Sequence, residues 1–157
     1  MRNRNVPLWI KKKAHDECIL PVLTYGSETW SISATKLQKL VTTQRKMERI
    51  MLGLTLRDRK KATWIRQKTG VTDIIQHIRS QKHRWAGHIC RMRDNRWTIR
   101  VTEWYPRPKK RPRGRPKRRW NDDLCQALGT NWSQMARDRL RWKQSREGFL
   151  SMERDTP

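Results

Sequence analysis

A run of fourteen residues, Pro106–Arg119, constrains the fold of this chain more than any other stretch. It reads PRPKKRPRGRPKRR and contains only Pro, Gly, Lys and Arg, with nine cations and four prolines. Proline cannot occupy a helix interior or a central strand, and the like charges repel one another. The run therefore cannot join a packed core, and it gains order mainly by lying against a polyanion. The sequence predicts a basic linker at 106–119 that separates residues 1–105 from residues 120–157.

The centre of this linker, Pro112–Pro116, has the form of an AT-hook, a short arm that some chromatin proteins lay in the DNA minor groove. Prolines keep the backbone extended, Gly114 leaves room at the groove floor, and Arg113 and Arg115 project into its negative potential. Phosphate contacts without groove preference, true minor-groove reading, and a solvated linker or nuclear-import signal all stay open. The candidate nucleic-acid-binding residues of the linker are Arg107, Lys109, Lys110, Arg111, Arg113, Arg115, Lys117, Arg118 and Arg119.

The charge balance favours a nucleic-acid partner. The chain of 157 residues has 38 Lys and Arg against 14 Asp and Glu, a net charge of +24, and it keeps +15 without the nine linker cations. Such a field attracts polyanions, with binding that weakens as salt rises. A membrane partner is disfavoured because the longest uncharged apolar run, Cys18–Gly26, is too short to span a bilayer.

Two further features favour a protein that is not secreted. The N-terminal residues MRNRNVPLWIKKK do not resemble a signal peptide. The cysteines, Cys18, Cys90 and Cys125, are odd in number and show neither a disulfide framework nor zinc-ligand spacing. We therefore expect a nuclear or cytoplasmic location.

Apolar side chains at helical spacing predict an all-α fold of two small helical modules, a thumb-like bundle and a C-terminal helix pair, joined by the linker. Residues 8–30 carry one helical stripe, with Pro21 bending or splitting it and residues 20–26 as a buried joint. The stripe comprises Ala14, Cys18 and Val22, with Ile10, Ile19 and Leu23 beside them.

A second helix is predicted over residues 35–52, capped by Thr35 and stopped by Gly53. Its apolar side chains are expected to face the core; they are Leu37, Leu40, Val41, Met47 and Met51. Its other face carries five cations that are candidate nucleic-acid-binding residues; these are Lys36, Lys39, Arg45, Lys46 and Arg49.

The remaining helices follow from caps and glycines. A short helix opens at Asp58 or Thr63 and ends at Gly70, and Thr72 caps a longer one. The stripe of that longer helix comprises Ile74, Ile75, Ile78, Trp85, His88, Ile89 and Met92. Asn95 caps a helix over 96–104. After the linker, a helix containing Trp120, Leu124 and Leu128 stops at Gly129. A final helix begins at Asn131, and its stripe comprises Trp132, Met135, Ala136, Arg139, Trp142 and Phe149.

The residues of this chain do not predict catalysis, a cofactor or a metal site. Acidic residues are scattered, and the adjacent pair Asp122–Asp123 falls in a predicted first helical turn, where the helix dipole favours it. His83, His88 and Cys90 lack a fourth ligand and point in different directions around a helix. Residues 60–92 also resemble a helix-turn-helix, although Ile74 and Ile75 stand where polar reading side chains belong, so core packing is favoured over groove reading.

A series of short motifs, in order, resembles the region that follows the polymerase palm in non-LTR (LINE-type) retrotransposon reverse transcriptases. The resemblance covers roughly residues 10–150. The matching segments are Cys18–Trp30, Gln44–Arg49, Met51–Gly53, Leu56–Arg59, Trp64–Arg66, Lys68–Thr69, Val71–Asp73, Trp85–Met92, Asp94–Trp97, Gly114–Pro116, Arg119–Trp120, Asp122–Asp123, Asn131–Trp132 and Asp138–Arg139.

This resemblance implies the thumb and C-terminal tail of such an enzyme. The family's Tyr-x-Asp-Asp polymerase loop and its endonuclease lie outside the matched region, so a nucleic-acid-binding fragment without catalytic activity is expected. A thumb holds an RNA–DNA hybrid or duplex by its backbone, which suits the basic faces described above. No CCHC zinc knuckle is present, so the resemblance implies no metal. An independent DNA-binding or chromatin-associated protein that uses the AT-hook-like arm is the alternative.

Overall fold

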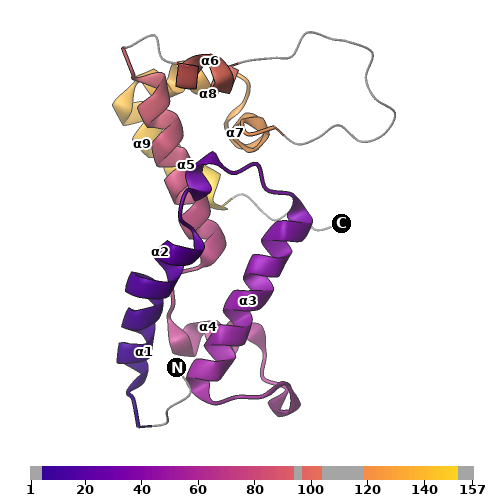
Figure 1. Ribbon diagram of the computed structural model, residues 1–157. Coiled ribbons are helices and arrows are strands. Elements are labelled where there is room, and N and C mark those ends of the chain that lie inside the picture. The colour runs from indigo at the N-terminus through magenta and orange to yellow at the C-terminus, as the bar shows by residue number, and fades with distance from the viewer. Residues whose placement is uncertain (1–4, 94–96, 104–118, 152–157) are drawn as a thin grey trace, which may run out of the picture. The chain divides into compact units, whose positions relative to one another are not determined.

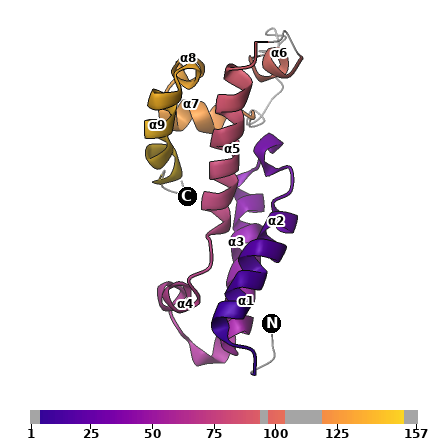
Figure 2. The same cartoon turned by 90° about the vertical axis from the view of Figure 1, so that its left-hand side faces the viewer.

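The described residues form helices and connecting turns. The computed structural model describes residues 5–93, 97–103 and 119–151, and no strand is found within these ranges (Figures 1 and 2). The all-α prediction is confirmed for this part of the chain. None of the helices in these ranges is long and apolar enough to cross a membrane.

The chain divides into two compact units. Unit 1 comprises Met1–Gly26 and Ala34–Ile78, and unit 2 comprises Ser27–Ser33 and Arg79–Pro157. The predicted boundaries around the basic linker fall at residues 104–118, outside the described ranges, and stay predictions.

Unit 1 begins with three consecutive helical segments. They are α1 (Leu8–Ala14), a π-helical turn η1 (His15–Ile19) and α2 (Leu20–Leu23), whose first turn contains Pro21. Pro21 has no amide hydrogen to donate to the preceding helical turn. The π-helical turn η1, which is wider than an α-helical turn, lies directly before the helix that contains this proline.

The predicted apolar stripe of this segment is wrong. Ala14 and Cys18 are exposed, and Val22 is 77% exposed, so residues 20–26 do not form a wholly buried joint. The buried side chains are instead Lys11, His15, Leu20 and Thr24. Polar groups can take these places because they find partners: Lys11 Nζ donates to the carbonyl oxygen of Met51 (3.1 Å), and Thr24 Oγ1 donates to that of Leu20 (2.7 Å).

Helix α3 (Ala34–Leu52) packs against α1 and against α4 (Ala62–Thr69) (Figure 1). It begins one residue before Thr35, so the predicted cap residue lies inside the helix. Its end is the predicted one. Gly53 has φ +69°, and the amides of Gly53 and Leu54 donate to the carbonyl oxygens of Ile50 and Arg49 (3.2 and 2.9 Å), a Schellman motif.

The start of α5 (Ile74–Cys90) is fixed to α3 by Gln44. The buried Gln44 amide donates to the carbonyl oxygen of Thr72 (2.8 Å), and its Oε1 accepts from the Ile74 amide (2.9 Å). Asp73, rather than the predicted Thr72, caps α5, because its Oδ1 accepts from the amides of Ile75 and Gln76 (2.8 and 3.2 Å). Between α3 and α4 a short turn, η3 (Leu56–Asp58), closes with a capping box, so Asp58 does not open a longer helix.

The core of unit 2 lies where the second half of α5 meets the C-terminal helices. These are α7 (Asp122–Leu128), α8 (Trp132–Arg137) and α9 (Arg139–Ser151), which pack together (Figure 2). Its buried apolar side chains are Ala86, Leu124, Trp132, Ala136, Trp142 and Phe149. The unit also contains the turn η2 (Ser27–Thr29) and α6 (Trp97–Glu103), which lies within the predicted helix over 96–104. The predicted cap, Asn95, lies outside the described residues.

The single C-terminal helix predicted from residue 131 is in fact two helices. Asp138 takes an extended conformation (φ −85°, ψ 114°) between α8 and α9. Its Oδ1 accepts from the amides of Leu140 and Arg141 (2.9 and 3.3 Å), so it caps α9. The break turns Arg139 out to solvent, while the predicted core positions Trp132, Ala136, Trp142 and Phe149 are buried as expected.

Candidate nucleic-acid interface

Three of the five predicted α3 cations form one exposed surface in unit 1, which we term the lysine face. Lys36, Lys39 and Lys46 are all exposed. At 3.6 residues per turn they fall within about 80° around the helix axis, roughly 150° from the centre of the buried stripe. That stripe consists of Val41, Gln44, Glu48 and Met51. The lysine face can therefore meet a phosphate backbone without disturbing the core of unit 1.

Arg45 and Arg49 do not belong to the lysine face. Both are half-buried and lie about 80° and 120° from the centre of the buried stripe. Arg45 Nε is buried without a hydrogen-bond partner, and the Arg45 charge acts on the neighbouring carboxyl of Glu48. The five predicted cations span about 180° around α3, and Arg45 and Arg49 stand at one edge of this basic face, where they are half-buried, whereas Lys36, Lys39 and Lys46 are exposed.

Most of the predicted linker site falls outside the described residues. This holds for Arg107, Lys109, Lys110, Arg111, Arg113, Arg115, Lys117 and Arg118. Arg119 is described, and its amide donates to Asp122 Oδ2 (2.6 Å), just before α7. Nucleic-acid contacts of the linker stay a prediction.

The acidic side chains of unit 2 stabilise the fold. Asp122 and Asp123 lie in the first turn of α7, as predicted, and Asp123 Oδ2 accepts from Lys82 Nζ (2.9 Å). Lys82 is 3% exposed and also lies over the Trp120 ring (5.0 Å). Asp138 caps α9, as described above. These carboxylates serve helix starts and a buried cation.

Carboxylates have the same role in unit 1. Asp73 forms an ion pair with Arg66 (2.7 Å) besides capping α5, and Asp16 Oδ1 lies 2.8 Å from His15 Nδ1 and accepts from the Thr72 amide (3.1 Å). Glu48 is 1% exposed. Burial raises the pKa of Glu48, and the charges of Arg66, His15 and Arg45 oppose that shift only in part. Within the described ranges, no group of His, Cys, Asp or Glu is able to hold a metal ion.

The helix-turn-helix interpretation fails at the start of α5. Ile74 and Ile75 are 1% and 5% exposed, and Gln44 fixes the preceding turn. A recognition helix presents its N-terminal side chains to the major groove. Because these side chains belong to the core of unit 1, packing explains the motif, as the sequence favoured.

The buried histidine of α5 is His83, whereas the sequence stripe contained His88. His83 stacks on Trp142 (centroids 4.1 Å apart, planes at 8°), and its Nε2 lies 3.2 Å from Ser145 Oγ. Burial lowers the pKa of His83 to about 4, and Arg146 and Arg91 act in the same direction. His88, which the sequence placed on the apolar stripe, is exposed and lies beside Trp85 (centroids 5.5 Å apart).

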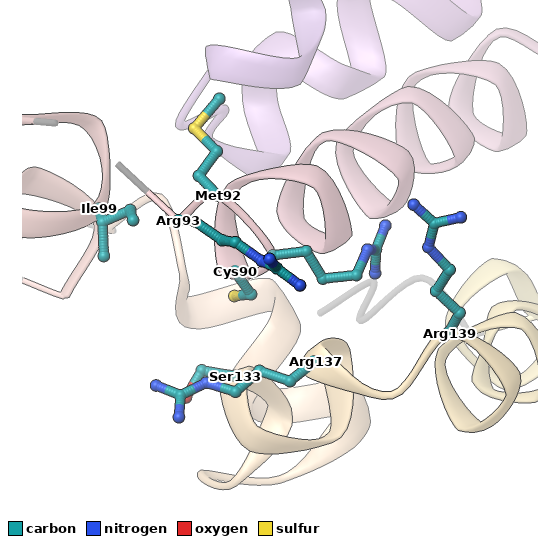
Figure 3. A pocket seen from close by; sticks show the side chains of 8 residues that line it. Cys90, Met92, Arg93, Ile99, Ser133, Arg137 and Arg139 are labelled. Atoms are coloured by element: carbon teal, nitrogen blue, oxygen red, sulfur yellow. The ribbon is translucent and has the colours of Figure 1, made fainter. Parts of the chain in front are cut away.

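One arginine-rich pocket in unit 2 was not predicted from the sequence. It measures about 630 Å³ and includes Arg91, Arg93, Arg137 and Arg139 in its wall (Figure 3). The two pairs lie 46 residues apart in the chain, at the end of α5 and at the junction of α8 and α9. Only the break at Asp138 and the packing of α8 on unit 2 bring them together, so periodicity could not reveal the pocket.

Comparisons with known proteins give one relative. No family model matches the chain, and no solved structure matches it. The chain is 34% identical over 146 residues to an uncharacterized transposon-derived protein of Caenorhabditis elegans, in a match that covers 85% of this chain and 52% of that protein. The chain thus spans about half the length of this relative. Over most of its own length, this chain is similar to a transposon-derived protein.

Proposed function

We propose that this chain is the nucleic-acid-binding C-terminal part of a non-LTR retrotransposon reverse transcriptase. In this role it holds an RNA–DNA hybrid or duplex by its sugar–phosphate backbone and carries neither the polymerase nor the endonuclease active site. The lysine face is the observation that carries the proposal. It places three cations on one side of a rigid helix, away from the core.

Two further observations support the proposal. The relative in Caenorhabditis elegans is described as transposon-derived, and the ordered motifs resemble the region after the polymerase palm. The carboxylates described in both units cap helices, pair with cations or lie buried, so they are not gathered for the two-metal chemistry of phosphoryl transfer. A binding role accounts for both the excess of positive charge and the placement of the negative charge.

The lysine face can be tested with a salt series. Fluorescence anisotropy would measure binding of a labelled RNA–DNA hybrid to the full chain and to the variant Lys36→Ala/Lys39→Ala/Lys46→Ala. Each phosphate contact contributes roughly 0.9 to the slope of log K against log salt, so we expect the slope to fall by up to about 3. The charge-retaining variant Lys36→Arg/Lys39→Arg/Lys46→Arg should keep the slope.

A charge-matched control distinguishes binding by the lysine face from attraction by the overall positive charge of the chain. Arg84, Arg141 and Lys143 are exposed cations of unit 2, and their replacement by Ala removes the same charge. An equal loss of slope in this control would refute a specific lysine face. Incorporation of nucleotides by the purified chain in a primer-extension assay would refute the non-catalytic part of the proposal.

The AT-hook-like sequence Pro112–Pro116 supports a second candidate function, that of an independent DNA-binding or chromatin-associated protein. This function predicts tighter binding to A·T-rich than to G·C-rich duplex, because the narrow A·T minor groove attracts arginine. The preference should disappear in Arg113→Ala/Arg115→Ala. Equal affinity of the unaltered chain for both duplexes would contradict it.

A further inference from the structure

The arginine-rich pocket of unit 2 concentrates positive charge in one partly open hollow. Arg91 and Arg93 follow the last turn of α5, while Arg137 ends α8 and Arg139 begins α9 (Figure 3). Among the described residues, no Asp or Glu lines this pocket. The pocket is therefore a site of strong positive potential within a single unit.

Arg91 is held in place by the protein itself. Its Nη1 donates to the carbonyl oxygen of Ala136 in α8 (2.7 Å), and the side chain passes close to Gly87 of α5. The side chain of Arg91 is half-buried, whereas Arg93, Arg137 and Arg139 are exposed. The pocket thus combines one fixed guanidinium with three that can adjust to a ligand.

Asp138 stands between two arginines of the pocket in the chain, but its carboxylate is occupied elsewhere. Its Oδ1 accepts from the amides of Leu140 and Arg141, and its Oδ2 lies 3.5 Å from Arg141 Nε. Its negative charge therefore serves the start of α9, although the residue stands between Arg137 and Arg139. Four like charges around one space repel one another, and an anion with several negative charges relieves that repulsion.

The chemistry of the wall identifies the class of anion. A guanidinium presents parallel N–H donors that match two phosphate oxygens at once. The volume of about 630 Å³ lies in the range of small-molecule sites and exceeds what a single phosphate fills. Met92 and Ile99 add apolar surface to the same wall, which suits a sugar or a base.

We infer that this pocket binds the phosphate group of a nucleotide, with arginines of its wall on the phosphate and the apolar side chains beside the nucleoside. The nucleotide is either free or the phosphorylated 5′ end of a polynucleotide. The site is separate from the lysine face and does not depend on the function proposed for that face.

The inference can be tested by direct binding to the full chain. The probes are inorganic phosphate, adenosine 5′-monophosphate and adenosine 5′-triphosphate in calorimetry, and one labelled single-stranded oligonucleotide, with and without a 5′-phosphate, in fluorescence anisotropy. We expect Arg137→Ala/Arg139→Ala to weaken binding of the recognised probe at least tenfold. Arg141→Ala/Lys143→Ala removes two exposed cations of α9 outside the pocket and should change affinity less than threefold.

The probes also separate the two sources of phosphate. Binding of the mononucleotides assigns the pocket to a free nucleotide, whereas binding of the oligonucleotide only when it carries a 5′-phosphate assigns it to a polynucleotide end. Equal loss of binding in the pocket and control variants, or the absence of phosphate-dependent binding by every probe, would overturn the inference. Circular dichroism of each variant checks that the exposed substitutions leave the helices intact.

Discussion

Gly87 lies directly against the Trp142 ring in unit 2, and replacing it with Ala should destabilise the protein. A Cβ at this position would lie 2.6 Å from Trp142 Cδ1 and 2.9 Å from Arg91 Nη1, and closer still to Trp142 Nε1. Carbon atoms in contact are about 3.5 to 4.0 Å apart. The Trp142 ring therefore has to move away from α5 by roughly 1 Å.

That movement disturbs two contacts of the Trp142 ring. Its Nε1 donates to the carbonyl oxygen of His83 (3.1 Å), and its ring stacks on the His83 ring at 4.1 Å. A buried donor left without its acceptor costs about 1 to 3 kcal/mol, and overpacking costs a similar amount. Ala is better than Gly in a helix by about 1 kcal/mol. We expect Gly87→Ala to lower the free energy of unfolding by about 1 to 5 kcal/mol.

Gly148 provides the matched control for this prediction. It also lies within a helix, α9, but a Cβ added there has no atom within 4 Å. Gly148→Ala should therefore raise the free energy of unfolding by up to about 1 kcal/mol. Urea unfolding followed by circular dichroism measures both variants. The reasoning is refuted if Gly87→Ala is as stable as the unaltered chain or if the two variants shift in the same direction.

Two further predictions concern side chains whose roles follow from the structure. His83 is neutral in the folded protein, with a pKa of about 4, and takes up a proton on unfolding below pH 6.5. The stability that the neutral His83 contributes is therefore complete above pH 6.5 and is lost as pH falls toward 4, by no more than about 3 kcal/mol. Urea unfolding across this pH range should show a steeper pH dependence for the unaltered chain than for His83→Phe. Equal pH dependence of the two proteins would contradict the prediction. Asp138→Ala removes the cap of α9 and should lower the free energy of unfolding by about 1 kcal/mol, while Asp138→Asn should retain most of the capping energy. Thermal melts in which both variants match the unaltered chain would show that the cap contributes nothing.

The helix ends were the part of the fold that the sequence predicted best. Gly53, Gly70 and Gly129 each follow a helix with positive φ, and Gly70 and Gly129 donate to the carbonyl oxygens of Arg66 and Cys125 (2.8 and 2.9 Å). Glycine adopts this conformation at little cost, so its position in the sequence carries the information locally. The N-terminal ends were harder to predict, because several polar residues stand near each one and only tertiary contacts choose between them.

The buried faces were predicted less well because unit 1 and unit 2 bury polar side chains. Lys11, Gln44 and Lys82 are at most 8% exposed, and each has a hydrogen-bond partner distant in the chain. A binary pattern treats such residues as solvent-facing, and it then assigns the apolar side chains of the opposite face to the core. Val22 was misplaced in this way, whereas the predicted burial of Trp132 and Phe149 is confirmed.

The same polar contacts explain why so cationic a chain can fold and still present cations to a partner. A buried cation needs a nearby acceptor, and Lys82 and Arg66 take the carboxylates of Asp123 and Asp73. Helix starts take further carboxylates, as at Asp138. Carboxylates committed to buried cations offset little of the positive charge on the surface, so with 14 acidic residues against 38 basic ones the excess falls on exposed side chains such as those of the lysine face. Positive potential at the surface is thus a consequence of how the interior is held together, and a polyanionic partner relieves the repulsion that the fold leaves there.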